Sequence, residues 1–279
     1  MENRRIIAVF FLLIILCPLP AGSEEKPRWE LGVGAGILQM PDYRGSDESR
    51  FYFLPYPYLV YRGGLLKIDE QRISGQIFKT NRVLLNLSAF GAVPVESSGN
   101  DARAGMPDLD PTFELGPALR IGLVESKKDK YKLSLNLPLR AFFSTDFSSV
   151  RHEGWVFSPR LDFEKKDLIT QTGIDFGVSA GPLFADSSYT DYFYMVEPAY
   201  ATAARPAYCA GGGYSGSTVT IGLRKTYKQL IFSAFVSADF LQGAVFEDSP
   251  LVRAKTSIMS GFNVSWIFLK SAHTVASDN

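Results

Sequence analysis

The sequence has few of the side chains that catalysis and metal binding most often use. It contains two histidines and two cysteines, and its Lys+Arg and Asp+Glu counts are equal at 29 each. This balance argues against a nucleic-acid-binding surface or a strongly basic membrane-binding face, because both need an excess of positive charge. After residue 23 no stretch offers about 18 uninterrupted apolar residues, so no transmembrane helix is expected.

The first residues have the pattern of a secretory signal peptide. Two arginines precede an apolar run at 6–17, and small residues follow at 21–23. A basic start, a short apolar core and a small-residue exit are typical of export signals. We therefore predict a signal peptide at 1–23, cleaved after Ala21 or Ser23.

Cysteine has no evident structural role in this chain. Cys17 follows Leu16, where a lipoprotein would carry a small residue, so a lipid anchor is not expected. Once the signal is removed Cys209 is the only cysteine, and it cannot form an intramolecular disulfide.

What the chain does have is alternation. Along 131–143 apolar residues occupy every second position, while Lys132, Ser134, Asn136 and Arg140 lie between them. Side chains alternate faces in a strand, so one face is apolar and the other carries charge. The pattern recurs in segments of about 9–11 residues, the length of a tilted strand that crosses a bilayer. Strands cross lipid only as a closed barrel, because an open edge leaves backbone groups unpaired.

The connections predict a transmembrane antiparallel β-barrel of about twelve strands, with short periplasmic turns and long extracellular loops. The long links are 41–50, 94–111, 144–153, 182–216 and 242–254. Short and long links alternate only if 65–81 is split into a hairpin around 70–72, which puts both termini in the periplasm. The barrel would then occupy 24–268 and a tail 269–279. Prolines at 55, 57, 117, 138 and 159 predict bends or bulges.

Two observations favour lipid over water around this barrel. Aromatic residues gather near both ends of the predicted strands. This distribution is typical of membrane proteins, whose aromatic side chains lie in the two lipid headgroup regions. The face opposite the apolar one carries charges that would line the lumen: Glu114, Arg120, Arg140, Arg160, Asp162 and Asp175. The alternative is a water-soluble barrel with the same aromatics in its core, which alternation alone does not exclude.

Several stretches resemble the MipA/OmpV family, the MltA-interacting and outer membrane protein V group. They extend from about residue 29 to 268 and include PDYRGSDE at 41–48, PYPY at 55–58, YRG at 61–63, NDAR at 100–103, GMPDLDP at 105–111, DYFY at 191–194, PAY at 206–208, GGG at 211–213 and DSP at 248–250. The resemblance implies a non-enzymatic barrel in the bacterial outer membrane, with no cofactor. Such barrels usually end on an aromatic residue, whereas this chain continues past Phe268.

The same resemblance suggests partners. One branch of the family is a scaffold that joins a lytic transglycosylase to a penicillin-binding murein synthase, and other branches are linked to adhesion. We therefore expect a scaffold in murein remodelling that contacts outer-membrane lipid and no nucleic acid. The alternatives are an adhesin and a narrow channel or small-solute uptake barrel, the latter suggested by the mixed-charge lumen.

Two chemical alternatives rest on loop residues. His152 lies near Ser148, Ser149 and Asp146, and a hydrolase would need these groups within hydrogen-bond reach of one another. Three loop carboxylates could contribute to a Ca²⁺ site, although an EF-hand pattern is missing. Solvated loop residues and turn formers are the expected roles, so we predict no catalytic residue and no metal site.

Long outer loops supply the candidate binding residues: Asp42, Tyr43, Arg44, Asp101, Arg103, Asp108, Asp110, Tyr192 and Tyr194. The 182–216 loop is rich in tyrosine, which offers a large contact area at a low entropic cost. Two roles are open for this loop. It could present a ligand or partner surface, or it could fold inward and plug the barrel.

Overall fold

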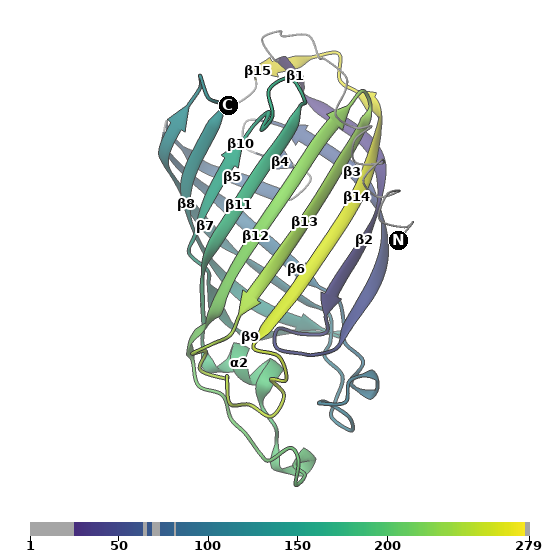
Figure 1. The fold of residues 1–279 in the computed structure, drawn as a ribbon, viewed down its shortest axis with the longest axis vertical. Helices are drawn as coiled ribbons and strands as arrows, with labels where there is room; N and C mark the ends of the chain where they lie inside the picture. Colours follow the sequence, from purple (N-terminus) through teal and green to yellow (C-terminus); the bar gives the residue numbers. More distant parts are fainter. Residues whose placement is uncertain (1–24, 64–65, 69–72, 81, 277–279) are drawn as a thin grey trace, which may run out of the picture.

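The computed structural model describes residues 25–63, 66–68, 73–80 and 82–276, and these form a tilted antiparallel β-barrel (Figure 1). The predicted signal peptide at 1–23 lies outside the described residues. The strands of the wall are β2 (Trp29–Pro41), β3 (Ser49–Arg62), β4 (Leu66–Ile68), β5 (Ile73–Lys79), β6 (Val83–Ala92), β7 (Thr112–Ser126), β8 (Tyr131–Thr145), β9 (Val150–Phe157), β10 (Arg160–Lys165), β11 (Ile174–Ala185), β12 (Gly213–Tyr227), β13 (Leu230–Phe240) and β14 (Thr256–Lys270).

The wall closes on itself. β14 pairs with β2, and β10 pairs with both β8 and β11. β9 and β10 lie along successive lengths of β8, so they act as one interrupted strand of this 13-stranded sheet. The prediction of about twelve antiparallel strands is confirmed. The hairpin at 65–81 is present as β4 and β5.

Two of the five prolines expected to bend the wall do interrupt its strands. Pro159 falls in the break between β9 and β10. Beside Pro117 the β7–β8 pairing skips from Leu115 to Ala118. A proline has no N–H to donate to a ladder, so the pairing is interrupted at these two positions. Pro55 and Pro57 instead pair with β2 without a register shift, so the expected irregularity is not found there.

One predicted loop is wrong. β8 runs to Thr145 and β9 starts at Val150, so 144–153 is a tight hairpin rather than a long link. Asp146 accepts hydrogen bonds from the backbone N–H groups of Ser148 and Ser149 at 2.9 and 2.7 Å, and Phe147 takes a positive φ of 65°. Asp and Ser residues build such turns through their own side chains.

The apolar face points outward. Val236 and Phe262 are 52% and 50% exposed, whereas Ser134, on the lumen side, is 1% exposed. Exposed aromatics gather at both ends of the wall: Tyr227, Trp266 and Phe268 at one, Trp155, Phe157 and Phe240 at the other. A water-soluble barrel would bury its apolar face, so the described wall is built for a lipid environment. Within the described chain no helix has the length and apolar character to cross a membrane.

Short elements lie at the two ends. At one end, β1 (Glu25–Pro27) pairs with β15 (Thr274–Ala276), so the tail after β14 joins the start of the described chain. At the opposite end lie α2 (Ser187–Tyr194) and the 3-10 turns η1 (Ser97–Gly99) and η2 (Pro198–Tyr200) (Figure 1). The termini and the short turns share one end, which is the periplasmic end of an outer-membrane barrel.

Candidate interaction sites at the two ends of the barrel

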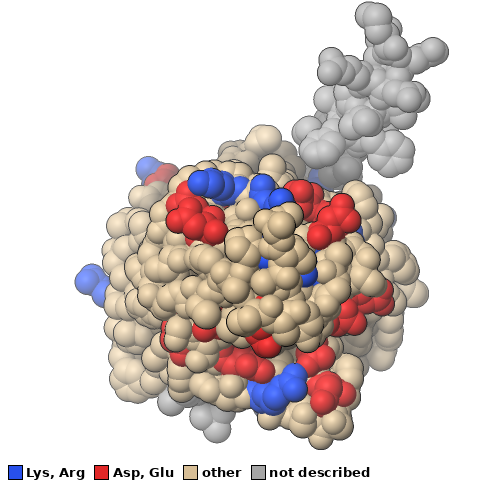
Figure 2. Space-filling view, turned by 90° about the horizontal axis from the view of Figure 1, so that it is seen from below, with Lys and Arg blue, Asp and Glu red and all other residues tan. Residues whose placement is uncertain are grey.

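Four loops pack together at the outer end, and we call them the outer cap: 42–48, 93–111, 186–212 and 241–255. They share one apolar cluster of buried residues: Tyr43, Val95, Ala102, Leu109, Tyr194, Val196, Ala210, Leu241, Ala244, Phe246 and Leu251. Isolated bridges between Val95 and Leu109 and between Val196 and Tyr208 stiffen two of the loops. Seen from this end, the cap presents a continuous surface of side chains with several acidic patches (Figure 2).

Helix α2 seats the tyrosine-rich loop in the mouth of the barrel. Asp186 caps the helix by accepting from the N–H of Tyr189 at 3.0 Å. The ring of Tyr189 meets Phe142 of β8 edge-on, with centroids 4.7 Å apart, and Val156 of β9 packs in the same cluster. Of the two roles left open for this loop, the inward-folded one matches the observed packing.

Tyr43, Arg44 and Tyr194 from the predicted set come together in the cap. The hydroxyl of Tyr194 donates to the carbonyl of Arg44 at 2.8 Å, and that of Tyr43 to the carbonyl of Leu251 at 2.8 Å. The guanidinium of Arg44 pairs with Asp239 of β13 at 3.2 Å. Burial raises the pKa of Tyr43 to about 12 and that of Tyr194 well above its usual value.

Arg103 and Asp108 fold the 93–111 loop onto itself. Arg103 donates to the hydroxyl of Ser97 at 3.1 Å and to the carbonyl of Phe193 at 3.2 Å. Asp108 accepts from the N–H of Ser97 at 2.7 Å. Burial lowers the pKa of Arg103, and its guanidinium lies over the ring of Tyr43, 5.9 Å from the centroid.

The remaining predicted loop residues bind neighbouring loops as well. Asp42 pairs with Arg50 at 2.7 Å, and the backbone N–H of Asp101 donates to Glu48 at 2.6 Å. The carboxylate of Asp110 pairs with Arg151 at 2.5 Å, and its carbonyl accepts from the hydroxyl of Tyr192 at 3.2 Å. These side chains hold the cap together rather than converge on a ligand site. Among the described residues, no three His, Cys, Asp or Glu side chains could hold a metal ion.

The hydrolase arrangement around His152 is not assembled. The hydroxyls of Ser148 and Ser149 both donate to Asp146. The imidazole ring instead contacts the aromatic rings of Phe143 and Trp155, with centroids 5.4 and 5.6 Å away. A nucleophile and its base must share a hydrogen bond, and the described geometry leaves the two apart.

The predicted lumen charges form two paired groups. Arg140 and Glu114 make a buried ion pair at 2.5 Å. The carboxylate of Asp162 forms ion pairs with Arg120 and Arg160, each at 3.2 Å. It also accepts a hydrogen bond from the hydroxyl of Ser179 at 2.7 Å. The sixth predicted residue, Asp175, lies near the periplasmic end and accepts from the N–H of Asp167 at 3.0 Å.

The sequence interpretation missed a basic feature of the periplasmic end. The turns here expose several lysines: Lys127, Lys128, Lys130, Lys166 and Lys228. The loops of the opposite end carry the acidic residues Asp47, Glu48, Glu96, Asp101, Asp108, Asp191, Glu197, Glu247 and Asp248. The net charge of zero hides this separation of basic and acidic residues between the two ends. Counting the charges of the short links and of the long links separately would have shown it.

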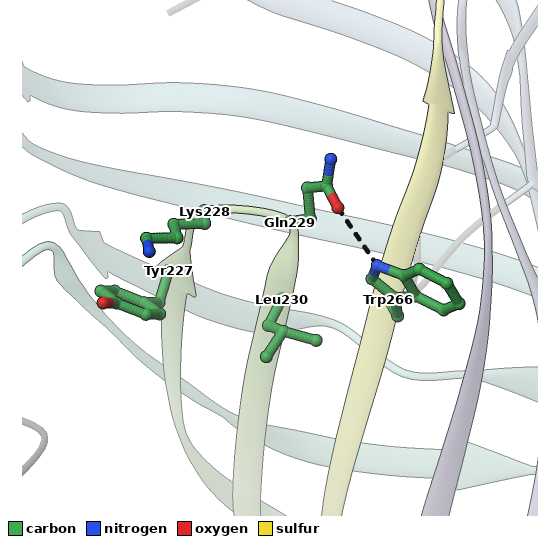
Figure 3. A pocket seen from close by; sticks show the side chains of 5 residues that line it. All are labelled: Tyr227, Lys228, Gln229, Leu230 and Trp266. Carbon is green, nitrogen blue, oxygen red and sulfur yellow. Dashed lines mark hydrogen bonds between the residues drawn. The ribbon is translucent and has the colours of Figure 1, made fainter.

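A shallow pocket lies on the same end, on the hairpin of β12 and β13 (Figure 3). Tyr227, Leu230 and Trp266 supply its apolar surface, and the indole N–H of Trp266 donates to the side-chain oxygen of Gln229 at 3.2 Å. The position and the amphipathic rings fit the headgroup region of the inner leaflet.

Several solved structures of barrel proteins resemble this chain at low sequence identity. OprB of Pseudomonas putida is 9% identical over 70% of this chain and 47% of its own, with a TM-score of 0.38. Outer membrane phospholipase A of Escherichia coli is 11% identical over 91% and 96%, with a TM-score of 0.35. The Pseudomonas putida toluene transporter TodX is 11% identical over 89% and 69%, with a TM-score of 0.27. Likenesses this distant carry no information on activity.

A family model gives the identity. No curated protein matches the chain. The model of the MltA-interacting protein MipA matches residues 33–268, which is nearly the whole described barrel. With its outward apolar face and paired lumen charges, this chain is a β-barrel of the bacterial outer membrane and belongs to the MltA-interacting protein MipA family.

Proposed function

We propose that this barrel is a non-enzymatic scaffold that holds murein-remodelling enzymes against the periplasmic face of the outer membrane. The family name and the resemblance suggest a lytic transglycosylase as one partner and a penicillin-binding murein synthase as a second. The observation that carries the proposal is the contrast between the two ends. The outer end is filled by its own loops, while the periplasmic end offers exposed lysines on short turns.

The lysines give this end a chemical preference. Lys127, Lys128 and Lys228 are exposed and lie on the turns of two hairpins, β7–β8 and β12–β13. Charged groups at an interface steer association and set specificity, and their effect weakens with salt. The partner surface that fits is therefore acidic.

A pull-down from solubilised envelopes tests this proposal. The unchanged chain should enrich the transglycosylase or the synthase, and a Lys127→Glu/Lys128→Glu/Lys228→Glu variant should lose that enrichment. Arg253→Glu, which changes an exposed charge of the outer cap, is the matched control and should capture as much as the unchanged chain. If the unchanged chain enriches neither enzyme, the scaffold role is wrong.

A second candidate is a narrow channel, favoured by one observation. The side chains of Arg120 and Arg160 are only partly buried, so solvent reaches charges inside the wall. Planar-bilayer recording decides this alternative. Conductance steps from the unchanged chain would support a channel, and their absence at every voltage would remove it.

A further inference from the structure

The described part of the wall is incompletely hydrogen-bonded between β3 and β6. Among the residues that the structure describes, β4 pairs with β3 at Tyr61 and Arg62, and β5 pairs with β6 through partners at 84–86. In the described chain, residues 49–60 of β3 pair with β2 on one edge and with no strand on the other. Residues 87–92 of β6 likewise pair with β7 alone. At about 3.3 Å per residue, the single-sided length of β3 is on the order of 40 Å.

This break is bounded at both ends. Toward the periplasm lies the short β4–β5 hairpin. Toward the outside, the 93–111 loop reaches across, because Arg50 donates to the carbonyl of Gly99 at 3.1 Å and the N–H of Asp101 donates to Glu48 at 2.6 Å. The break therefore lies at the depth of the apolar band rather than at the rim.

Proline makes the β3 edge a poor partner for another strand. The N–H of Arg62 donates to the carbonyl of Arg28, so even-numbered residues of β3 face β2 and odd-numbered ones face the break. Pro55 and Pro57 are odd-numbered and carry no N–H. Strand addition from a second copy of this chain would lose two of its ladder hydrogen bonds here.

The lumen side of the break carries two exposed apolar side chains beside the polar Tyr56 and Ser88. Leu54 and Phe90 share the inward face with Gly36 and Glu114, their cross-strand partners. They are 39% and 60% exposed, so a large part of each apolar side chain is left uncovered. Elsewhere on this face the side chains of Ser134 and Ser237 are buried and polar.

We infer that an acyl chain of a membrane lipid enters the wall between β3 and β6 and contacts Leu54 and Phe90 from the bilayer. Apolar groups flank the break on the outside, where Phe51 and Phe53 are among the most exposed residues of the barrel. An acyl chain covers apolar surface without needing the donors that the prolines remove. This site is independent of the periplasmic lysines and of any partner enzyme.

Tryptophan quenching by lipids brominated on their acyl chains tests the inference. Trp29, Trp155 and Trp266 are first replaced by Phe, and single reporters are then added to the full mature chain in vesicles. Phe90→Trp should lose as much fluorescence as the outward reference Phe53→Trp. The control is Phe235→Trp, an inward aromatic on β13, which is paired on both edges; it should stay bright.

Leu54→Trp is a second reporter on the opposite edge and should behave like Phe90→Trp. Heat-modifiable migration on gels shows which variants have folded, so a misfolded reporter is replaced by the other. If both folded reporters remain as bright as Phe235→Trp, lipid does not enter and the inference is overturned. A Phe53→Cys variant that cross-links to a second copy of itself, together with unquenched reporters, would show that another barrel covers the β3 edge. That result would also overturn the inference.

Discussion

Tyr194 and Phe246 stack face to face, with ring centroids 3.7 Å apart and planes 8° from parallel. Tyr194 is the last residue of α2, and Phe246 lies in the loop between β13 and β14. Both side chains are buried, and the hydroxyl of Tyr194 also binds the carbonyl of Arg44. This stack therefore joins three of the four loops of the outer cap.

Phe246→Ala should loosen the cap while leaving the barrel folded. Removing a fully buried Phe costs about 3–5 kcal/mol, and the cost falls on loops that open without breaking the sheet. Hydrogen exchange should speed up in 186–212 and stay slow in β12 and β13. The control is Phe147→Ala, which removes an exposed ring of the outer surface and should change neither region. Unchanged exchange in Phe246→Ala would contradict the stack's role.

The cap should also open in alkali. Burial raises the pKa of Tyr43 to about 12, partly offset by Arg103, and burial also raises that of Tyr192 to about 12. Above the ordinary tyrosine pKa of about 10 the open state loses protons that the closed state keeps, so cap stability falls as pH rises from there toward the folded pKa. Tyrosinate absorbance and exchange in 186–212 should rise together, and Tyr43→Phe should reduce the pH dependence.

Glu114 and Arg140 form the most enclosed charge pair of the lumen, at 2.5 Å. Glu114→Gln should destabilise the barrel by about 3–5 kcal/mol, because it leaves the guanidinium buried without its partner charge. The double variant Glu114→Leu/Arg140→Leu should recover much of this loss. Reversible urea unfolding in lipid gives both values, with Arg253→Leu as an exposed control. A double variant less stable than Glu114→Gln would show that the pair contributes more than a hydrophobic replacement.

Alternation and loop lengths were enough to predict the barrel. The apolar face of 131–143 points outward as expected, and strict alternation of short and long links required the β4–β5 hairpin. Turn chemistry was harder to interpret. Asp146 with Ser148 and Ser149 builds a tight hairpin, but the same residues also fit a long loop, because composition does not specify hydrogen bonds.

The candidate residues were located better than their roles. The rings of Tyr43 and Tyr194 and the guanidinium of Arg103 do lie together. These three residues and Asp108 hydrogen-bond to backbone groups of the loops, because buried polar groups need partners and the loops supply them. The single-sided edge of β3 could not be predicted from the sequence. It depends on how far β4 extends along its neighbour, and a pattern of three residues does not determine that length.

Helix α2 offers the most local test of the cap. Asp186 accepts from the N–H of Tyr189 at 3.0 Å, and Gly154 lies so close that a Cβ there would sit 2.2 Å from the same carboxylate. Asp186→Ala should cost about 1 kcal/mol at the helix start, whereas Asp186→Asn should keep the cap because an amide oxygen also accepts. Exchange of the Tyr189 amide measures the difference.

The same carboxylate explains why position 154 has to be glycine. Gly154 has a φ of +128°, which side chains rarely adopt, and it leaves room for Asp186. Gly154→Ala should therefore speed exchange at Tyr189 at least as much as Asp186→Ala does, since it displaces the carboxylate and strains β9 together. Exchange at Tyr189 that is slow in both Ala variants would mean that the helix is held by Phe142 and Val156 alone, without its N-cap.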